Sequence, residues 1–342
     1  MRILILTCNT GEGHNSCAKA IKQVCDQRGD TCDLADSLHF VSDKLSRFVS
    51  WGHVTMYRHI PGLFRAGYGF AEQHPALLED DAAAYKLLTG GTKALYEYLH
   101  AGQYDAVICT HVFSALLLVQ TMKEFPLSLK TVFVGTDYTC SPGTATGGID
   151  RYFIPAAALT MDKAAAKRQF GIDPAHTHLL MMCGSMGCGP MEKLAESLSR
   201  GMDGDMELSI VCGTNEKLRE SLQKQFGDFE NIHIHGFVNQ IGAMMDSADL
   251  YLTKPGGISV TEAAVKRLPM VLIDAVAGCE AHNLRFFTAL GGAVTADDPK
   301  KLAKLCLTLL RDPEARAEMS EKLTALGVGN GAQCICDAMK EV

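Results

Sequence analysis

The stretch RILILTCNTGEGHNSCAKAI, residues 2–21, joins a short apolar run to a helical pattern through a loop that contains two glycines. The apolar run is typical of a fully buried strand. The pattern that follows repeats at the spacing of one helix face, at Cys17, Ala20, Ile21, Val24 and Cys25. A strand, a glycine loop and a helix in this order indicate a parallel α/β sheet.

The same alternation continues along all 342 residues. It predicts strands at residues 2–8, 31–35, 105–110, 130–135, 151–154, 177–183, 207–213, 232–236, 249–253 and 270–273. It predicts helices in the second half at 190–200, 215–226, 240–247, 258–267, 280–290 and 299–310. Because this length exceeds one typical domain, we expect an α/β protein with two Rossmann-like domains facing a central cleft. The expected domains are residues 1–155 and 156–342, joined by a short helical connector after Pro155, with the final helix free to pack back on the first domain.

The composition excludes several classes of protein. With 47% hydrophobic and 21% charged residues the chain suits ordinary globular cores, and a formal net charge of −7 argues against a nucleic-acid partner. The longest apolar stretch, residues 106–122, is broken by Thr110, His111, Ser114 and Gln120, which makes it a poor transmembrane helix. The N-terminal residues of the chain lack the pattern of a secretory signal, so we expect a cytoplasmic protein.

Thirteen cysteines raise the alternatives of a metal site or a disulfide framework. No C-x-x-C pair is present, and many of the cysteines lie inside apolar, strand-like runs. We therefore expect reduced thiols that act as small core side chains, with no bound metal.

Three loops share one local design, in which an apolar strand runs into glycines and then a helix. They are TCNTGEGHNS (7–16), MMCGSMGCGP (181–190) and LTKPGGISVTEA (252–263). In a parallel sheet such loops lie at the carboxyl ends of strands, where ligands bind, and a helix N-terminus offers N–H groups to an anion. None is a Walker A loop or a G-x-G-x-x-G loop. For a single glycine loop, a structural turn and a ligand-binding loop are equally plausible. Three such loops favour one ligand site that all of them line.

The third loop is the most informative. Gly256, Gly257 and Ser259 begin a helix and can bind a diphosphate through N–H and hydroxyl groups. Glu262, one turn later, suits the paired hydroxyls of a ribose, which donate two hydrogen bonds. The alternative is that Glu262 only complements the positive end of the helix, and the spacing leaves both interpretations open.

KPGGISVTEAAVKRLPMVLID (254–274), AGCEAHN (277–283) and NTGEGHNSCAKAI (9–21) together resemble the monogalactosyldiacylglycerol synthase and processive diacylglycerol glucosyltransferase family. This family is related to the N-acetylglucosaminyltransferase that makes lipid II. The resemblance covers nearly the whole chain. It implies a GT-B fold, a UDP-sugar donor held mainly by the second domain, and inverting transfer with no required metal and no cofactor.

The resemblance also assigns roles to residues of this sequence. His14 matches the histidine of the family's G-x-G-H loop, as catalytic base or acceptor-side residue, and Asp137 matches its T-D loop beside the acceptor. Without the resemblance, a lone histidine after a turn is more often a helix-start residue. Donor-binding residues are expected at Gly13; at Ser185, Met186 and Gly187 near the phosphates; at Phe237 and Val238 near the uracil; at Gly256, Gly257, Ile258, Ser259 and Glu262 near the diphosphate and ribose; and at Glu280 and Asn283 near the sugar.

The chain departs from the family pattern at three places. Cys279 stands where the family's sugar-contacting segment has glutamine, the H-x-x-W continuation after Asp137 is missing, and the connector after Pro155 is shorter than the family's. The first departure concerns the donor sugar, and the other two concern the acceptor.

Residues 44–71 contain four Lys or Arg residues, no acid, and the only tryptophan of the chain. Basic residues beside exposed aromatic rings are typical of a segment that meets an anionic bilayer. The alternative is a helical pair whose rings are core, and the two interpretations are compatible. The candidate membrane or acceptor residues are Trp51, Tyr57, Arg58, Phe64 and Arg65.

The leading hypothesis is an enzyme that moves a hexose from a UDP-sugar to a membrane lipid, diacylglycerol or a glycosyldiacylglycerol. It would lie peripherally on the inner face of the cell membrane, against an anionic surface. Three alternatives stay open: a UDP-sugar epimerase of GT-B fold, a UDP-GlcNAc transferase acting on a polyprenyl-linked or other acceptor, and a non-catalytic nucleotide-sugar or membrane-binding module.

Overall fold

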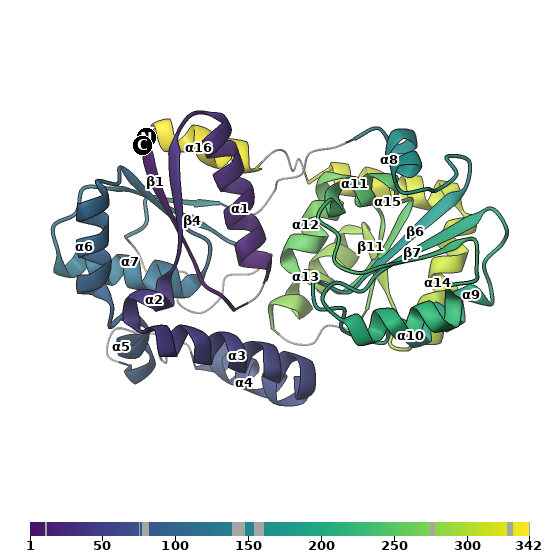
Figure 1. Cartoon of the computed structure of the whole chain (residues 1–342), viewed down its shortest axis with the longest axis horizontal. Helices are drawn as coiled ribbons and strands as arrows, with labels where there is room; N and C mark the ends of the chain where they lie inside the picture. The colour runs from purple at the N-terminus through teal and green to yellow at the C-terminus, as the bar shows by residue number, and fades with distance from the viewer. Residues whose placement is uncertain are drawn as a thin grey trace. The chain divides into compact units, whose positions relative to one another are not determined.

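The computed structural model describes residues 1–10, 12–74, 76, 82–138, 148–153, 161–273, 278–326 and 331–341. The chain divides into two compact units, each with its own sheet (Figure 1). The first unit comprises Met1–Pro155, Val276–Cys279 and Asn330–Val342, and the second comprises Ala156–Ala275 and Glu280–Gly329.

The first unit contains a five-stranded parallel sheet in the order β2-β1-β3-β4-β5. Its strands are β1 (Arg2–Thr7), β2 (Thr31–Asp36), β3 (Ala106–Cys109), β4 (Lys130–Val134) and β5 (Arg151–Phe153). All five strands predicted in the first half of the sequence are therefore confirmed. β3 is buried along its whole length, and so is β1 after its first residue. Both are continuous apolar runs, as expected for strands that are covered on two faces.

Eight helices surround this sheet within the described residues. They are α1 (Glu12–Gln27), α2 (Ser37–Val41), α3 (Asp43–His59), α4 (Pro61–Gln73), α5 (Ala83–Thr89), α6 (Thr92–Gly102), α7 (Val112–Glu124) and α16 (Gly331–Glu341). α1 buries the face that contains Ala18, Ile21 and Cys25, close to the predicted stripe. α16 packs against α1 although more than 300 residues separate them (Figure 1).

The second unit contains a six-stranded parallel sheet in the order β11-β10-β9-β6-β7-β8. Its strands are β6 (Thr177–Met182), β7 (Met206–Val211), β8 (Ile232–His235), β9 (Leu250–Thr253), β10 (Met270–Leu272) and β11 (Ala293–Thr295). The five predicted strands of this half are confirmed. β11 was not predicted, because an edge strand of three residues carries too little apolar pattern to stand out.

The helices of the second unit are α8 (Lys163–Gln169), α9 (Met191–Ser199), α10 (Glu216–Phe226), α11 (Ile241–Ser247), α12 (Gly257–Val265), α13 (Cys279–Leu290), α14 (Pro299–Arg311) and α15 (Pro313–Thr324). Six of these match predicted helices, and α8 is the short connector. α15 was not predicted, whereas α16 of the first unit is the final helix that was expected to pack back on the first domain. α15 begins at Pro313 behind Asp312, whose carboxylate accepts a hydrogen bond from the N–H of Ala315, so a Pro-and-cap signal marked its start.

Two further expectations bear on the class of protein. The cysteines described by the structure are free thiols, and most of them are buried, in agreement with a core role. Within the described residues, no helix is both long and apolar enough to cross a membrane.

Candidate active site

His14 lies in the first turn of α1, directly after the glycine loop that follows β1. Its Nδ1 is 2.7 Å from the carbonyl oxygen of Thr110 and 3.2 Å from Oγ1 of Thr136. Because a carbonyl can only accept, Nδ1 carries the proton and donates it to Thr110. Nε2 of the neutral ring therefore keeps its lone pair, and this nitrogen is the one that can take a proton.

Asp137 is coupled to His14 through Thr136. The Thr136 hydroxyl donates to Oδ2 of Asp137 at 3.2 Å. Burial lowers the pKa of His14, while the negative charge of Asp137 and the bond to Thr110 raise it, and the net direction is downward. The ring is thus neutral near pH 7, with a carboxylate close enough to stabilise it once it is protonated. The two predicted catalytic residues lie together.

Three residues of this site were missed in the sequence. Thr110 and His111 follow β3, and Thr136 follows β4, so the site is built from loops at the ends of the neighbouring strands β1, β3 and β4. Nδ1 of His111 accepts from the N–H of Phe113 at 3.1 Å, and its ring meets His14 edge to face with centroids 4.5 Å apart. Polar residues at the carboxyl end of a buried strand were the available signal.

A chain of side-chain amides ties down the loop that precedes His14. Nδ2 of Asn15 donates to Oδ1 of Asn9 at 3.0 Å, and Nδ2 of Asn9 donates to Oδ2 of Asp36 at 2.9 Å. The same buried carboxylate oxygen accepts the Ser46 hydroxyl at 2.7 Å. The helix start that presents His14, together with Gly13 in its first turn, is therefore fixed to β2 and α3.

In the second unit, the backbones of the glycine loops after β6 and β7 contact each other closely. The N–H of Thr214 donates to the carbonyl of Ser185 at 2.8 Å. A Cβ on Gly187, whose φ is +55°, would lie 2.2 Å from the carbonyl oxygen of Cys212, so no larger residue fits. Nδ2 of Asn215 donates to the carbonyl of Gly187 at 3.0 Å. Ser185, Met186 and Gly187 thus form a loop held by the end of β7, a partner not predicted from the sequence.

The loop after β9 leads into α12 through Gly256, and this helix begins without a side-chain cap. Its first N–H groups, from Gly257, Ile258 and Ser259, are of the kind that an anion satisfies. Glu262 lies in the second turn, where burial raises the pKa of its carboxyl to about 7, against a lowering by Lys266. The ammonium of Lys266 is itself paired with Asp246 at 2.7 Å.

Lys254, the first residue after β9, was not predicted to take part in the site. Its Nζ is 2.9 Å from Oε1 of Glu280 in α13, and its Cε would be 2.8 Å from a Cβ on Gly184. Three segments that the sequence singled out therefore meet at this lysine. Asn283, one turn after Glu280, is fully buried and donates to the carbonyl of Pro255 at 3.0 Å, so its amide holds the glycine loop in place.

The remaining predicted donor residues, Phe237 and Val238, lie in the loop after the edge strand β8. Phe237 is one of the exposed large hydrophobic residues of the chain. An exposed aromatic ring beside a loop at this edge of the sheet is available for stacking on a base.

The predicted membrane segment forms α3 and α4, which lie against each other (Figure 1). The side chains of Phe48 and Trp51 are 67% and 65% exposed, and Ile60, Leu63 and Phe70 are also exposed. These rings are not core, which removes the plain structural alternative for them. The side chains of Tyr57, Arg58, Phe64 and Arg65 lie outside the described residues.

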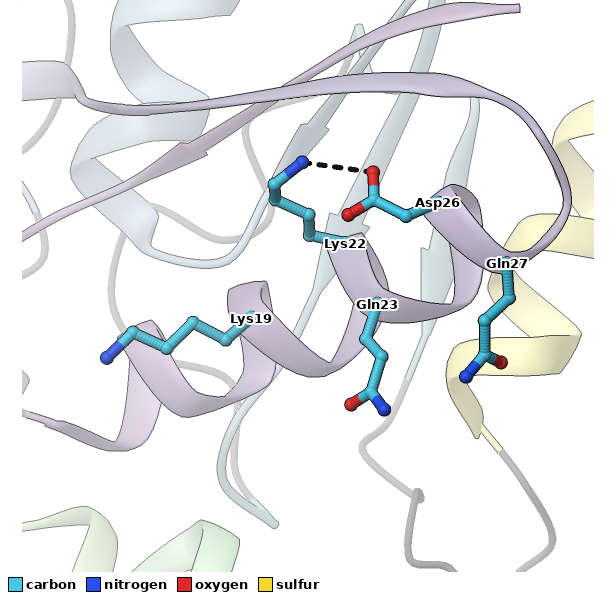
Figure 2. Close-up of a pocket in the computed structure, with 5 residues that line it drawn as sticks. All are labelled: Lys19, Lys22, Gln23, Asp26 and Gln27. Carbon is cyan, nitrogen blue, oxygen red and sulfur yellow. Dashed lines mark hydrogen bonds and ion pairs between the residues drawn. The ribbon is translucent and has the colours of Figure 1, made fainter. Parts of the chain in front are cut away.

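A hollow on the surface of α1 is separate from the His14 site. Figure 2 shows its lining, which comes from one helix: Lys19, Lys22, Gln23, Asp26 and Gln27. Lys22 turns toward Asp26, with its Nζ 3.0 Å from Oδ1. A hollow formed by the exposed face of a single helix has no converging catalytic groups, so it is not a candidate active site. Among the described residues, no group of three or more His, Cys, Asp or Glu side chains is arranged to hold a metal ion.

Comparisons with known proteins show the family and the fold. Residues 14–175 match the family described as monogalactosyldiacylglycerol (MGDG) synthase, and residues 191–325 match glycosyl transferases group 1. The processive diacylglycerol beta-glucosyltransferase of Bacillus pumilus (strain SAFR-032) is 25% identical over 376 aligned positions, which cover 99% of this chain and 94% of that protein. The enzyme of the same name from Staphylococcus carnosus (strain TM300) is 30% identical over 275 positions, 72% of this chain and 69% of that protein.

Among solved structures, MurG of Acinetobacter baumannii superposes with a TM-score of 0.68 at 16% identity, over 100% of this chain and 99% of that one. A likeness at this identity shows the fold, which is GT-B. The loops that the fold places at the strand ends are those that carry His14 and the glycine segments. The chain is thus a glycosyltransferase that belongs to the monogalactosyldiacylglycerol synthase and processive diacylglycerol glucosyltransferase family.

Proposed function

We propose that this glycosyltransferase transfers a hexose from a UDP-sugar to a hydroxyl of a membrane lipid, diacylglycerol or a glycosyldiacylglycerol, with inversion at the anomeric carbon. The names of its relatives support a diacylglycerol acceptor and a glucosyl group. The residues of the two units support the division of the chemistry between an acceptor-side base and a donor-binding loop set.

The observation that carries the proposal is the tautomer of His14. The bond from Nδ1 to the Thr110 carbonyl directs the basic lone pair to Nε2. In the proposed step Nε2 takes the proton of the acceptor hydroxyl, the oxygen bonds to the anomeric carbon, and the bond from that carbon to the diphosphate breaks, releasing UDP. Asp137 then offsets the positive charge of the imidazolium through its electrostatic coupling to the ring.

The second unit is proposed to hold the donor. The carboxylate of Glu262 would accept hydrogen bonds from the ribose hydroxyls, and the uncapped start of α12 would face the diphosphate. The Ser185–Gly187 loop would approach the phosphates, Phe237 would lie beside the uracil, and Glu280 would contact the hexose. No cofactor is needed in this scheme, because the UDP-sugar is itself a substrate.

The exposed apolar residues of α3 and α4 support peripheral binding to a membrane surface, since rings that are two-thirds exposed gain by entering the interface between headgroups and acyl chains. The basic residues of the same segment would favour an anionic surface, and we propose the inner face of the cell membrane as the site of action.

The decisive experiment incubates the purified chain with a panel of UDP-sugars and membrane lipids and identifies the products by mass spectrometry. We expect a hexosyl lipid, with a β linkage by NMR when the donor is an α-linked UDP-hexose. Conversion of one UDP-sugar into its epimer with no lipid product would support the epimerase alternative instead. Transfer to a polyprenyl-linked acceptor alone would contradict the diacylglycerol assignment.

A further inference from the structure

Lys254 lies where two glycine loops of the second unit approach α13. Its side chain is only 19% exposed, and it pairs at 2.9 Å with the side chain of Glu280, which is 13% exposed. Its Cε would lie 2.8 Å from a Cβ on Gly184, too close for a larger residue, and 3.6 Å from a Cβ on Gly256, an ordinary contact. The lysine stem therefore runs along two glycine loops, and its charge ends where these loops meet α13.

The ion pair joins one positive and one negative side chain, Lys254 and Glu280. Their burial weakens the shielding of both charges by water. An ammonium has three donors and can bond to several oxygens, whereas a carboxylate close to a bound anion repels it. A diphosphate carries several anionic oxygens, so it can compete with the Glu280 carboxylate for the Lys254 ammonium.

We propose that Lys254 binds the diphosphate of the donor and that Glu280 is its counter-ion until the donor arrives, an inference that rests on the proposed UDP-sugar donor. When the diphosphate binds the Lys254 ammonium, the ion pair between Lys254 and Glu280 weakens. The carboxylate of Glu280 then accepts a hydrogen bond from a hydroxyl of the hexose. As the bond to the anomeric carbon breaks, the charge that develops on the departing phosphate oxygen lies beside a fixed cation. A single ion pair thus connects phosphate binding to sugar recognition.

The test measures the binding of UDP and of uridine by calorimetry, because the two ligands differ in the diphosphate. For Lys254→Met we expect UDP affinity to fall about tenfold or more, as for loss of a charge-assisted hydrogen bond, with uridine affinity unchanged. Lys254→Arg should retain most of the UDP affinity. Glu280→Gln should bind UDP severalfold more tightly than the wild type, since the competing carboxylate is gone, and should discriminate less between UDP and UDP-hexose.

Lys304→Met is the matched control, because Lys304 is an exposed lysine on α14 of the same unit; it should bind both ligands as the wild type does. Equal UDP affinity in wild type and Lys254→Met would overturn the inference. A parallel loss of uridine and UDP affinity would also overturn it, since Lys254 would then only support the loop. If the wild type binds uridine but gains nothing from the diphosphate, the phosphate-binding role fails while a uridine nucleotide donor stands; if it binds neither ligand, the proposed donor itself fails.

Discussion

His14 can act as a base only while its ring is neutral, and its surroundings favour that form. Burial is the largest influence and lowers the pKa, so the ring stays unprotonated at pH values where an ordinary histidine is already charged. A lowered histidine pKa also means that acid destabilises the folded chain, because the unfolded state takes up the proton first. Both the basic form of His14 and the stability of the fold are therefore lost as pH falls.

We expect the kcat/KM of the wild type to fall only below the usual histidine pKa of about 6.5. The variant His14→Ala should lower kcat about a hundredfold or more at pH 7.5. UDP binding should survive the substitution, because the proposed donor residues other than Gly13 belong to the second unit. His100→Ala, at an exposed histidine of α6, is the control and should leave both quantities unchanged. An acid limb above pH 7, or a variant as active as the wild type, would contradict the role of His14 as base.

Glu262 titrates in the opposite sense, since burial raises the pKa of its carboxyl to about 7. We expect UDP affinity to increase as pH rises through this value, because only the ionised carboxylate accepts hydrogen bonds from both ribose hydroxyls. Glu262→Gln should bind UDP more weakly at pH 8 and should lose this pH dependence, as measured by calorimetry from pH 6 to 8.5. UDP affinity that does not change between pH 6 and pH 8 in the wild type would remove the ribose role.

The raised pKa of Glu262 also affects the stability of the fold. The folded chain binds the Glu262 proton more tightly than the unfolded chain does. Protonated Glu262 therefore contributes to the free energy of unfolding below the ordinary carboxyl pKa, and this contribution is lost as pH rises from about 4.5 to about 7. At pH 8 the buried charge is therefore a cost to the fold. Such a cost at the end of a glycine loop is what a binding site tolerates and a purely structural helix avoids.

At the scale of elements, α3 and α4 form a helical pair with unusually exposed apolar side chains. The pair can be altered without disturbing the core, since surface substitutions away from buried contacts usually change stability by less than about 0.5 kcal/mol. The exposed rings are therefore more useful to an external apolar surface than to the fold.

We expect the double variant Phe48→Ser and Trp51→Ser to reduce cosedimentation with anionic phospholipid vesicles about tenfold, while its thermal midpoint stays within a few degrees of the wild type. The loss follows from removing apolar area that would enter the bilayer interface. Leu87→Ser, at a residue of α5 that is 57% exposed, serves as control and should sediment normally. Equal sedimentation of the double variant and the wild type would count against the membrane role of the helical pair.

At the scale of the whole molecule, the chain returns to its first unit with α16. Ile335, Cys336 and Met339 are buried on this helix, and Lys130 of β4 donates to the carbonyl of Met339 at 2.9 Å. The guanidinium of Arg28, the residue directly after α1, donates to the Asp337 carboxylate at 2.6 Å and to the carbonyl of Gln333 at 3.2 Å. The first unit is thus complete only when the last residues of the chain are in place.

We expect Met339→Ala to destabilise the first unit by about 2 to 5 kcal/mol, the usual cost of truncating a fully buried methionine, although it is close to the C-terminus. Chemical denaturation followed by hydrogen exchange should show the loss in the strands of the first sheet and not in those of the second. Cys334→Ala, at an exposed position of the same helix, should be neutral. A neutral Met339→Ala would show that α16 is dispensable to the unit.

Ten of the eleven strands were predictable because each buried strand is a contiguous apolar run. The glycine loops were predictable because glycines directly follow an apolar run in the sequence. β11 and α15 were not predicted, since three edge residues and a weakly amphipathic helix leave little local pattern. The segments containing His14, Glu262 and Glu280 were likewise found from local sequence together with the family resemblance.

The sequence by itself determined the two parallel α/β sheets and the loops at their strand ends, because periodicity and glycine placement are local properties. Only the tertiary structure decided which loops meet. The order β1-β3-β4 brings Thr110, Thr136 and Asp137 to His14, and the adjacency of β9 and β6 brings Lys254 against Gly184 and toward Glu280. Strand order and the residues that α16 contacts depend on pairs that lie tens to hundreds of positions apart, which no local pattern encodes.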